Sequence, residues 1–207
     1  MEKLAAFSGG APGAALLLAA IVIASLVGLF AAPSVIERNL FRPYWLVPRR
    51  EYWTLVSSGF IHADLTHLLF NAFTFWAFAF GLEREIGTPK FLALYFFGLL
   101  ASDIGTWFKH RNDSGYQTLG ASGAILAVLF ASIVYFPSGS IFILPIPIPI
   151  PSPLFAVAYL AYTYYASQRA RGRVNHDAHF SGAVAGIAFV MLTDPDAIRR
   201  ALRLLSG

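Results

Sequence analysis

Long apolar windows separated by short polar segments dominate the hydrophobic pattern of this chain. A helix needs roughly 20 mostly apolar residues to cross the roughly 30 Å of hydrocarbon in a bilayer, and windows near that length recur between charged or proline-rich breaks. Six of them are predicted to span the membrane: residues 12–32, 65–82, 91–107, 120–136, 154–167 and 178–192. The last three are short, which suits helices that do not all reach both surfaces. The pattern predicts an all-α polytopic membrane protein with a six-helix bundle, forming one domain over residues 1–207.

Three segments outside these windows carry a different pattern. Residues 33–64 mix Tyr and Trp with charged side chains, and aromatic rings prefer the headgroup level, so we expect this segment to lie partly in the membrane surface. Residues 145–153 have proline at every second position, which opposes a helix and predicts an extended segment. Residues 196–205 place three arginines among leucines and resemble a short amphipathic surface helix.

The composition supports a membrane protein and excludes several other classes. Apolar residues make up 57% of the chain and charged residues 13%, against about 25% charged in soluble proteins. The net charge of +4 does not indicate nucleic acid as a partner, because the basic residues lie between apolar segments. Cysteine is absent, which excludes disulfides, thiolate catalysis and cysteine-based metal sites.

The orientation of the chain in the membrane is only weakly indicated by its charges. Six spans put both termini on one side, where the loops hold six Lys and Arg residues against nine on the opposite side. The positive-inside tendency alone therefore slightly favours termini outside. The first window is longer than the core of a signal peptide, so we expect it to be retained.

Strongly polar side chains inside membrane helices are functional candidates by default, because burying them there is costly. The candidates are His67, Asn71, Ser122 and His179. Ser122 begins the fourth window among small residues, where the N–H groups of a helix start can donate to an oxyanion. A serine at a Gly/Ala packing interface is the alternative interpretation.

His179 lies near the start of the sixth window, as Ser122 lies near the start of the fourth. These two spans run in the same direction, so the two side chains meet if the helices are neighbours, and Gly182 and Gly186 would permit close packing. An imidazole beside a hydroxyl is the general-base arrangement for a serine nucleophile, although a lone histidine is more often structural. Asp177 points about 200° away from His179 around the helix, so the sequence predicts a Ser-His dyad and no triad.

The candidates for stabilising an oxyanion come from two segments. His67 and Asn71 are four residues apart, hence on one helix face, where both can donate to a shared acceptor. Polar contacts between helices would explain the pair equally well. The backbone of Gly120 and Ala121, beside Ser122, completes the predicted set.

These residues, in this order, resemble the rhomboid family of intramembrane serine proteases. Residues 67–71 resemble its His-x-x-x-Asn, residues 120–123 its Gly-x-Ser-Gly, and residues 178–186 its Ala-His-x-x-Gly-x-x-x-Gly. Residues 51–62 resemble the first loop of the family, and residues 81–87 the end of its second span. The likeness covers about residues 33–192. Thr54 replaces a usual arginine, and Leu126 stands where an aromatic ring often packs on the histidine.

The resemblance implies a six-span bundle with Ser122 as nucleophile and His179 as base, and no cofactor or metal. It also implies substrates that are single-span membrane proteins with small residues near the cut. The termini would be cytoplasmic and the site would face the extracytoplasmic side of a bacterial inner membrane, an orientation that we prefer over the charge count. Residues 168–177 are expected to form a mobile cover.

Two other functions are considered. A non-catalytic, client-binding relative would generally have lost the serine or the histidine, and both are present here. The other is binding of a metal or haem by histidines, either His67, His176 and His179 or His62. The sequence contains no His-Glu-x-x-His motif that would support such a site.

Overall fold

The chain folds into a bundle of helices, seen in a computed structural model that describes residues 9–143, 146–169 and 174–206. The long elements are α2 (Pro12–Leu26) with a π-helical end η1 (Val27–Ala31), α5 (Leu65–Ile86), α6 (Thr88–His110), α7 (Ser122–Tyr135), α8 (Ser152–Gln168) and α9 (His176–Thr193). Each of the six apolar windows is confirmed as a helix, with ends that move by a few residues.

The number of membrane crossings does not follow directly from the number of helices. Within the described residues, three helices are long and apolar enough to cross a bilayer: Pro12–Ala31, Leu65–Ile86 and Thr88–His110. A fourth arises if α9 and the following helix, bent by 109°, form one span, and α7 is a shorter apolar helix. The prediction of six crossings therefore stays a prediction.

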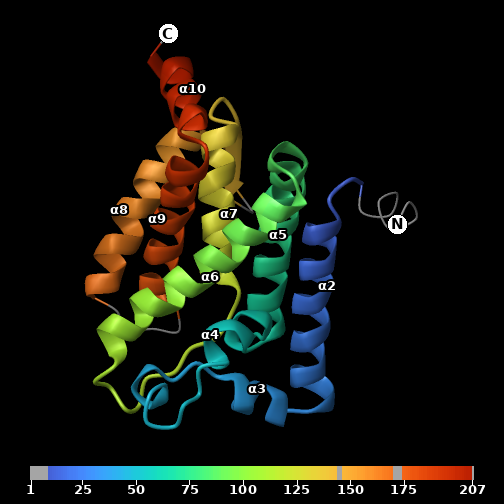
Figure 1. Cartoon of the computed structure of the whole chain (residues 1–207), viewed down its shortest axis with the longest axis vertical. Helices are drawn as coiled ribbons and strands as arrows, with labels where there is room; N and C mark the ends of the chain where they lie inside the picture. Colours follow the sequence, from blue (N-terminus) through green and yellow to red (C-terminus); the bar gives the residue numbers. More distant parts are fainter. Residues whose placement is uncertain (1–8, 144–145, 170–173, 207) are drawn as a thin grey trace.

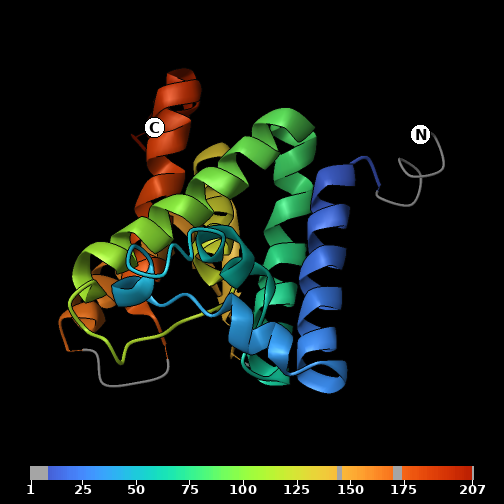
Figure 2. The ribbon, with the colours of Figure 1, turned by 60° about the horizontal axis from the view of Figure 1, so that its bottom comes forward.

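Helix α7 lies at the centre of the bundle. All of its residues from 123 to 133 are buried, because α5, α6 and α9 pack around it (Figure 1). This explains why its sequence is apolar on every face. At 14 residues it is about 21 Å long, and it runs in the same direction as α9 (Figure 1). Helix α6 crosses the bundle obliquely, and α2 stands beside α5 at its edge (Figures 1 and 2).

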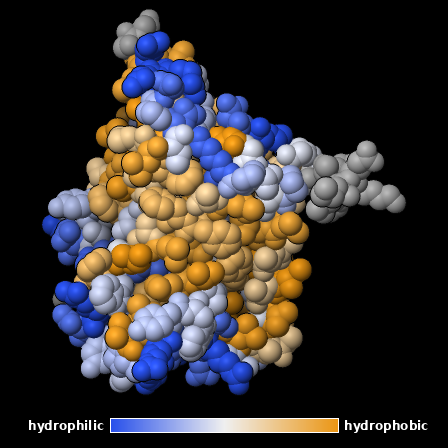
Figure 3. Space-filling model, viewed as in Figure 1, coloured by the Kyte–Doolittle hydropathy of each residue, from blue (hydrophilic) through white to orange (hydrophobic). Residues whose placement is uncertain are grey.

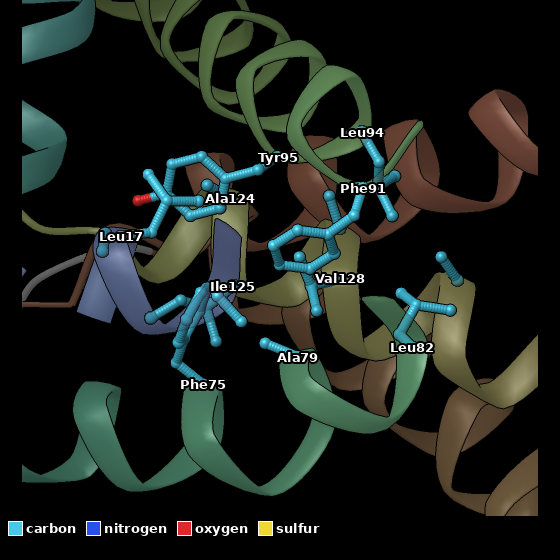
Figure 4. Close-up of a cluster of buried hydrophobic side chains, with 14 of the residues drawn as sticks. Leu17, Phe75, Ala79, Leu82, Phe91, Leu94, Tyr95, Ala124, Ile125 and Val128 are labelled. Atoms are coloured by element: carbon cyan, nitrogen blue, oxygen red, sulfur yellow. The ribbon is translucent and has the colours of Figure 1, made fainter. Parts of the chain in front are cut away.

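The main core lies where α5, α6 and α7 meet, with α2 closing one side (Figure 4). Large aromatic and aliphatic side chains interlock there with alanines of α7. Members drawn in the figure are Leu17, Phe75, Ala79, Leu82, Phe91, Leu94, Tyr95, Ala124, Ile125 and Val128. This core fixes the position of the first turn of α7, which carries Ser122.

Glycines allow α9 to approach α7 very closely, as the sequence predicts. A Cβ atom at Gly182 would overlap the backbone of Gly123, and one at Gly186 would overlap the backbone of Ala127. The two helices therefore touch backbone to backbone over two turns, which requires glycine at both positions.

A belt of exposed apolar side chains crosses the face of the bundle seen in Figure 3. In Figure 3 apolar residues cross the middle of the molecule and hydrophilic residues gather toward its ends. Phe30, Leu69 and Val157 are 65–69% exposed. So much exposed apolar surface is expected only where lipid or a partner covers it, and it supports an integral membrane protein.

The three segments outside the windows have mixed outcomes. Residues 33–64 form short helices: α3 (Ser34–Asn39), η2 (Pro43–Trp45), α4 (Thr54–Ser57) and η3 (Ser58–Phe60). The proline-rich segment is extended as expected in β2 (Ile146–Pro151), which pairs antiparallel with β1 (Ser140–Ile143). The prediction was wrong for residues 152–153, because proline is tolerated in the first turn of α8, and residue 145 lies outside the described residues. The helix predicted over residues 196–205 is confirmed as α10 (Pro195–Ser206), and its location at a membrane surface stays a prediction.

Candidate active site

Ser122 and His179 meet at the start of their two parallel helices. Ser122 is the first residue of α7, and His179 lies in the first turn of α9. The Nε2 atom of His179 is 2.9 Å from the Oγ atom of Ser122, a normal distance for a hydrogen bond. This geometry follows from the close α7–α9 packing at Gly182, one turn beyond His179.

Tyr159 of α8 holds the other side of the His179 ring. Its hydroxyl lies 3.1 Å from Nδ1, so when Nδ1 carries the proton it donates to the tyrosine oxygen, and Nε2 is free to accept from Ser122. The sequence analysis missed this residue. Leu126, which stands where the family often has an aromatic ring, packs in the same apolar cluster as Tyr159. The aromatic ring near the histidine therefore comes from α8.

Asp177 is engaged away from His179, as its position on the helix predicts. Its two carboxylate oxygens bind Lys109 at 2.7 Å and His110 at 2.9 Å, both at the end of α6. Lys109 also donates to the carbonyl of Ser167 near the end of α8. One lysine therefore ties the end of α8 to the start of α9. The cover expected over residues 168–177 lies partly outside the described residues.

His67 and Asn71 open into the cavity that contains Ser122 and His179. Both line it from α5, and no hydrogen bond within the described part of the chain engages either side chain. Gly120 approaches the imidazole of His67 so closely that a Cβ atom would lie 2.7 Å from its Cε1 atom. Gly120 also has a φ of 120°, which other residues rarely adopt, so glycine is required here twice.

The N–H groups of Gly120 and Ala121 are already engaged. Gly120 donates to the carbonyl of Ser58 at 2.9 Å, and Ala121 donates to Nε2 of His62 at 3.5 Å. Neither N–H is free for an oxyanion in this arrangement. The Ser122 N–H, at the first position of α7, has no intrahelical acceptor.

His62 supports this loop from a fully buried position. Because Ala121 donates to Nε2, the proton of the neutral ring sits on Nδ1, which lies 2.9 Å from the Oγ atom of Ser25 in α2. Ser25 in turn donates to the carbonyl of Phe60. Burial and, to a smaller extent, the nearby His67 lower the pKa of His62 to about 3, although Asp64 opposes the shift. The ring is therefore neutral at physiological pH.

A cavity of about 880 Å³ is lined by Ser122, His179, His67, Asn71 and Gly120. Besides the predicted residues it is lined by Ser58, Ser102 and Asp103, none of which the sequence analysis selected. Asp103 is a carboxylate inside an apolar window, and that signal was available in the sequence. Asn175 also lines the cavity: it caps α9 through Ala178. No group of three His, Cys, Asp or Glu residues in the described ranges could hold a metal ion.

Thr54, the departure from the family pattern in the first loop, has a local role. Its side chain is buried and its Oγ1 atom donates to the carbonyl of Glu51 at 2.6 Å. This hydrogen bond closes the turn at the start of α4. The helix that follows α4 contributes Ser58 to the cavity.

Comparison with known proteins gives a family match over most of the chain. The model of the Rhomboid domain matches residues 49–194. The putative rhomboid protease YdcA of Bacillus subtilis is 39% identical over 82 residues, which cover 40% of this chain and 40% of that protein. The rhomboid protease GluP of the same organism is 31% identical over 86 residues, covering 42% of this chain and 16% of GluP.

A mitochondrial protein is similar over a longer range. The presenilin-associated rhomboid-like protein of Homo sapiens is 27% identical over 172 residues, covering 78% of this chain and 44% of that protein. The matched part is thus less than half the length of each of these relatives.

Proposed function

Since this chain belongs to the rhomboid family, we propose that it is an intramembrane serine endopeptidase that uses Ser122 as nucleophile and His179 as base. Rhomboid proteins act on membrane-protein substrates within the bilayer. The observation that carries the proposal is the 2.9 Å contact between Nε2 of His179 and Oγ of Ser122, in a cavity large enough for a peptide segment.

The reaction would proceed through an acyl-enzyme. Oγ of Ser122 attacks the scissile carbonyl while Nε2 of His179 takes the hydroxyl proton and then gives it to the departing amine. Water, activated by the same nitrogen, then hydrolyses the ester. Tyr159 keeps the Nδ1–H of His179 oriented throughout, as the third group that orients the base in other serine hydrolases.

Three donors are proposed for the oxyanion: the side chains of His67 and Asn71 and the N–H of Ser122. Each is open to the cavity or lacks an intrahelical acceptor, and a lost donor of this kind typically costs about 10²–10³-fold in rate. Gly120 and Ala121 act indirectly, because their N–H groups hold the loop against Ser58 and His62.

We propose six membrane crossings within a single domain, by α2, α5, α6, α7, α8 and α9. The apolar belt and the parallel course of α7 and α9 support this arrangement. The chain would reside in a bacterial inner membrane with cytoplasmic termini, so that the cavity opens to the extracytoplasmic side and water can enter. Single-span membrane proteins are the proposed substrates.

Cleavage of a single-span test substrate in proteoliposomes tests this function. We expect Ser122→Ala and His179→Ala each to abolish cleavage while leaving the unfolding temperature near that of the parent protein, since both side chains face a cavity. Ser132→Ala, in the same helix α7 but outside the cavity, serves as the control and should cleave normally. Turnover that survives in either dyad variant would refute the proposal.

A further inference from the structure

Asp103 is a cavity carboxylate that the proposed reaction does not use. It lies on α6, is 7% exposed, and faces the same cavity as Ser122 and His179. Its Oδ2 atom accepts a hydrogen bond from Oγ of Ser58 at 3.2 Å. Its Oδ1 atom accepts none from the described residues, yet it is not sealed away from open space. One carboxylate oxygen of this cavity-lining side chain is thus left without a hydrogen-bond donor among the described residues.

None of the described residues that line the cavity is a Lys or Arg that could pair with the Asp103 carboxyl group. The acidic residues among them are Asp64 and Asp103. Asp64 caps α5 by accepting from the N–H of His67 at 2.8 Å, and the ion pairs of the described chain do not include Asp103. A buried carboxylate without a cationic partner is costly, and a cation supplied by a substrate would offset that cost.

Two contacts join the neighbours of Asp103 to the segment that carries the proposed nucleophile. The preceding residue, Ser102, packs directly against Gly123, which follows Ser122 in α7. Ser58, the partner of Asp103, accepts through its carbonyl from the N–H of Gly120 at 2.9 Å. Asp103 thus lies between two residues, Ser102 in sequence and Ser58 in space, that contact the segment carrying Ser122, and we expect a side chain flanking the scissile bond to lie there.

We propose that Asp103 is a specificity-determining residue that binds the Lys or Arg side chain of a substrate residue flanking the scissile bond. The inference rests on the proposed protease function and names a class of substrate for it. The ammonium or guanidinium group donates to Oδ1 as a charge-assisted hydrogen bond, while Ser58 holds Oδ2 in place.

A scan of one lysine along a single-span substrate tests the inference. Lys is placed in turn at each position near the cleavage site. Each of these substrates is compared with one that has Met at the same position, because the Met side chain is similar in length and uncharged. At one flanking position we expect kcat/KM to be about 10- to 100-fold higher for Lys than for Met. In Asp103→Asn, which retains the shape and an acceptor for Ser58, this ratio should fall to about 1.

The control is Asp196→Asn, which removes a carboxylate that is 67% exposed on α10 and should leave the ratio unchanged. A Lys-to-Met ratio near 1 at every position in the parent protein would overturn the inference, even if Asp103→Asn fails to fold. A ratio that survives in folded Asp103→Asn would overturn it as well. Cleavage of the Met substrates shows in each case that the protease function stands, whereas no cleavage and no covalent labelling of Ser122 would remove both proposals.

Discussion

At the scale of single residues, the proposed reaction depends on how the His179 ring is held. Its Nε2 atom contacts Ser122 and its Nδ1 atom contacts the hydroxyl of Tyr159. With no carboxylate of the described residues against the ring, a phenol hydroxyl supplies the orientation that an aspartate supplies in a triad. Tyr159 contacts the proposed base and is not among the described residues that line the cavity, so we propose that it is a positioning residue.

Removing the Tyr159 hydroxyl should slow the reaction without weakening substrate binding. For Tyr159→Phe we expect kcat to fall by about 3- to 10-fold, the equivalent of one neutral hydrogen bond, with KM unchanged. The measurement is steady-state cleavage of a single-span test substrate. Tyr164→Phe removes a hydroxyl from an exposed tyrosine of the same helix and should match the parent protein. A rise in KM at constant kcat would instead indicate a role in substrate binding.

Some of these residues could be predicted from sequence and others could not. Ser122 and His179 could be predicted because alternate spans run parallel, so residues at similar positions in two windows lie at similar depth in the membrane. Tyr159 could not be predicted, because its contact with His179 depends on how α8 packs against α9. No residue spacing along the chain indicates that packing. Asp103 was accessible as an intramembrane carboxylate, but its partner Ser58 comes from an irregular segment whose path the pattern does not define.

At the scale of elements, the contact between α7 and α9 determines the geometry of the site. Gly182 and Gly186 bring the two backbones together, and His179 lies one turn before the first of these contacts. The glycine spacing predicted this packing, since only small residues permit it. The engaged N–H groups of Gly120 and Ala121 could not be predicted, because their acceptors come from residues 58–62, far away in sequence.

Adding one methyl group at the helix contact should damage both stability and activity. In Gly182→Ala the new Cβ meets the backbone of Gly123, so the helices must separate, at a cost of about 1–3 kcal/mol in the free energy of unfolding. The hydrogen bond between Ser122 and His179 should lengthen and cleavage should drop. Unfolding in detergent and cleavage measure the two effects.

Gly81→Ala is the matched control for this change. Gly81 lies within α5 and nothing stands within 4 Å of its Cβ position, so the variant should be neutral or up to about 1 kcal/mol more stable through helix propensity. Equal effects of the two substitutions would contradict the role given to the α7–α9 contact.

At the scale of the whole molecule, buried polar contacts join elements that the apolar pattern treats as separate. Glu83 in α5 accepts from the N–H groups of Gly13 and Ala14 at 2.9 and 2.6 Å and so caps α2. His62 links α2, through Ser25, to the loop that carries Ser122. The apolar windows predicted the helices correctly, but these cross-links, which position the first segment against the site, are not periodic and leave no pattern.

Burial of His62 makes the stability of the fold depend on acid. Its pKa is about 3 in the folded protein against the ordinary histidine value of 6.5 when the chain is unfolded, so below pH 6.5 the unfolded chain takes up a proton that the folded chain does not. The contribution of His62 to the free energy of unfolding should be constant above pH 6.5. At lower pH the free energy of unfolding should decrease by up to about 1.4 kcal/mol per pH unit. Unfolding in detergent between pH 7 and pH 4 measures it.

Other acidic and histidine side chains titrate in the same range, so His62→Gln is the comparison. This variant should lose stability at neutral pH, because its contacts to Ser25 and Ala121 are weakened, and should show a shallower decline toward acid. Parallel stability profiles for the two proteins would contradict the assignment of the acid sensitivity to His62.

The most direct test of the proposed function is covalent labelling of Ser122 by a fluorophosphonate probe in liposomes, located by mass spectrometry of the labelled peptide. Phosphonylation requires an alcohol activated by a neighbouring base, so we expect stoichiometric labelling at Ser122 in the parent protein and none in Ser122→Ala or His179→Ala. A folded parent protein that cleaves no substrate and does not react with the probe, or that reacts equally well without His179, would contradict the account of a Ser-His protease.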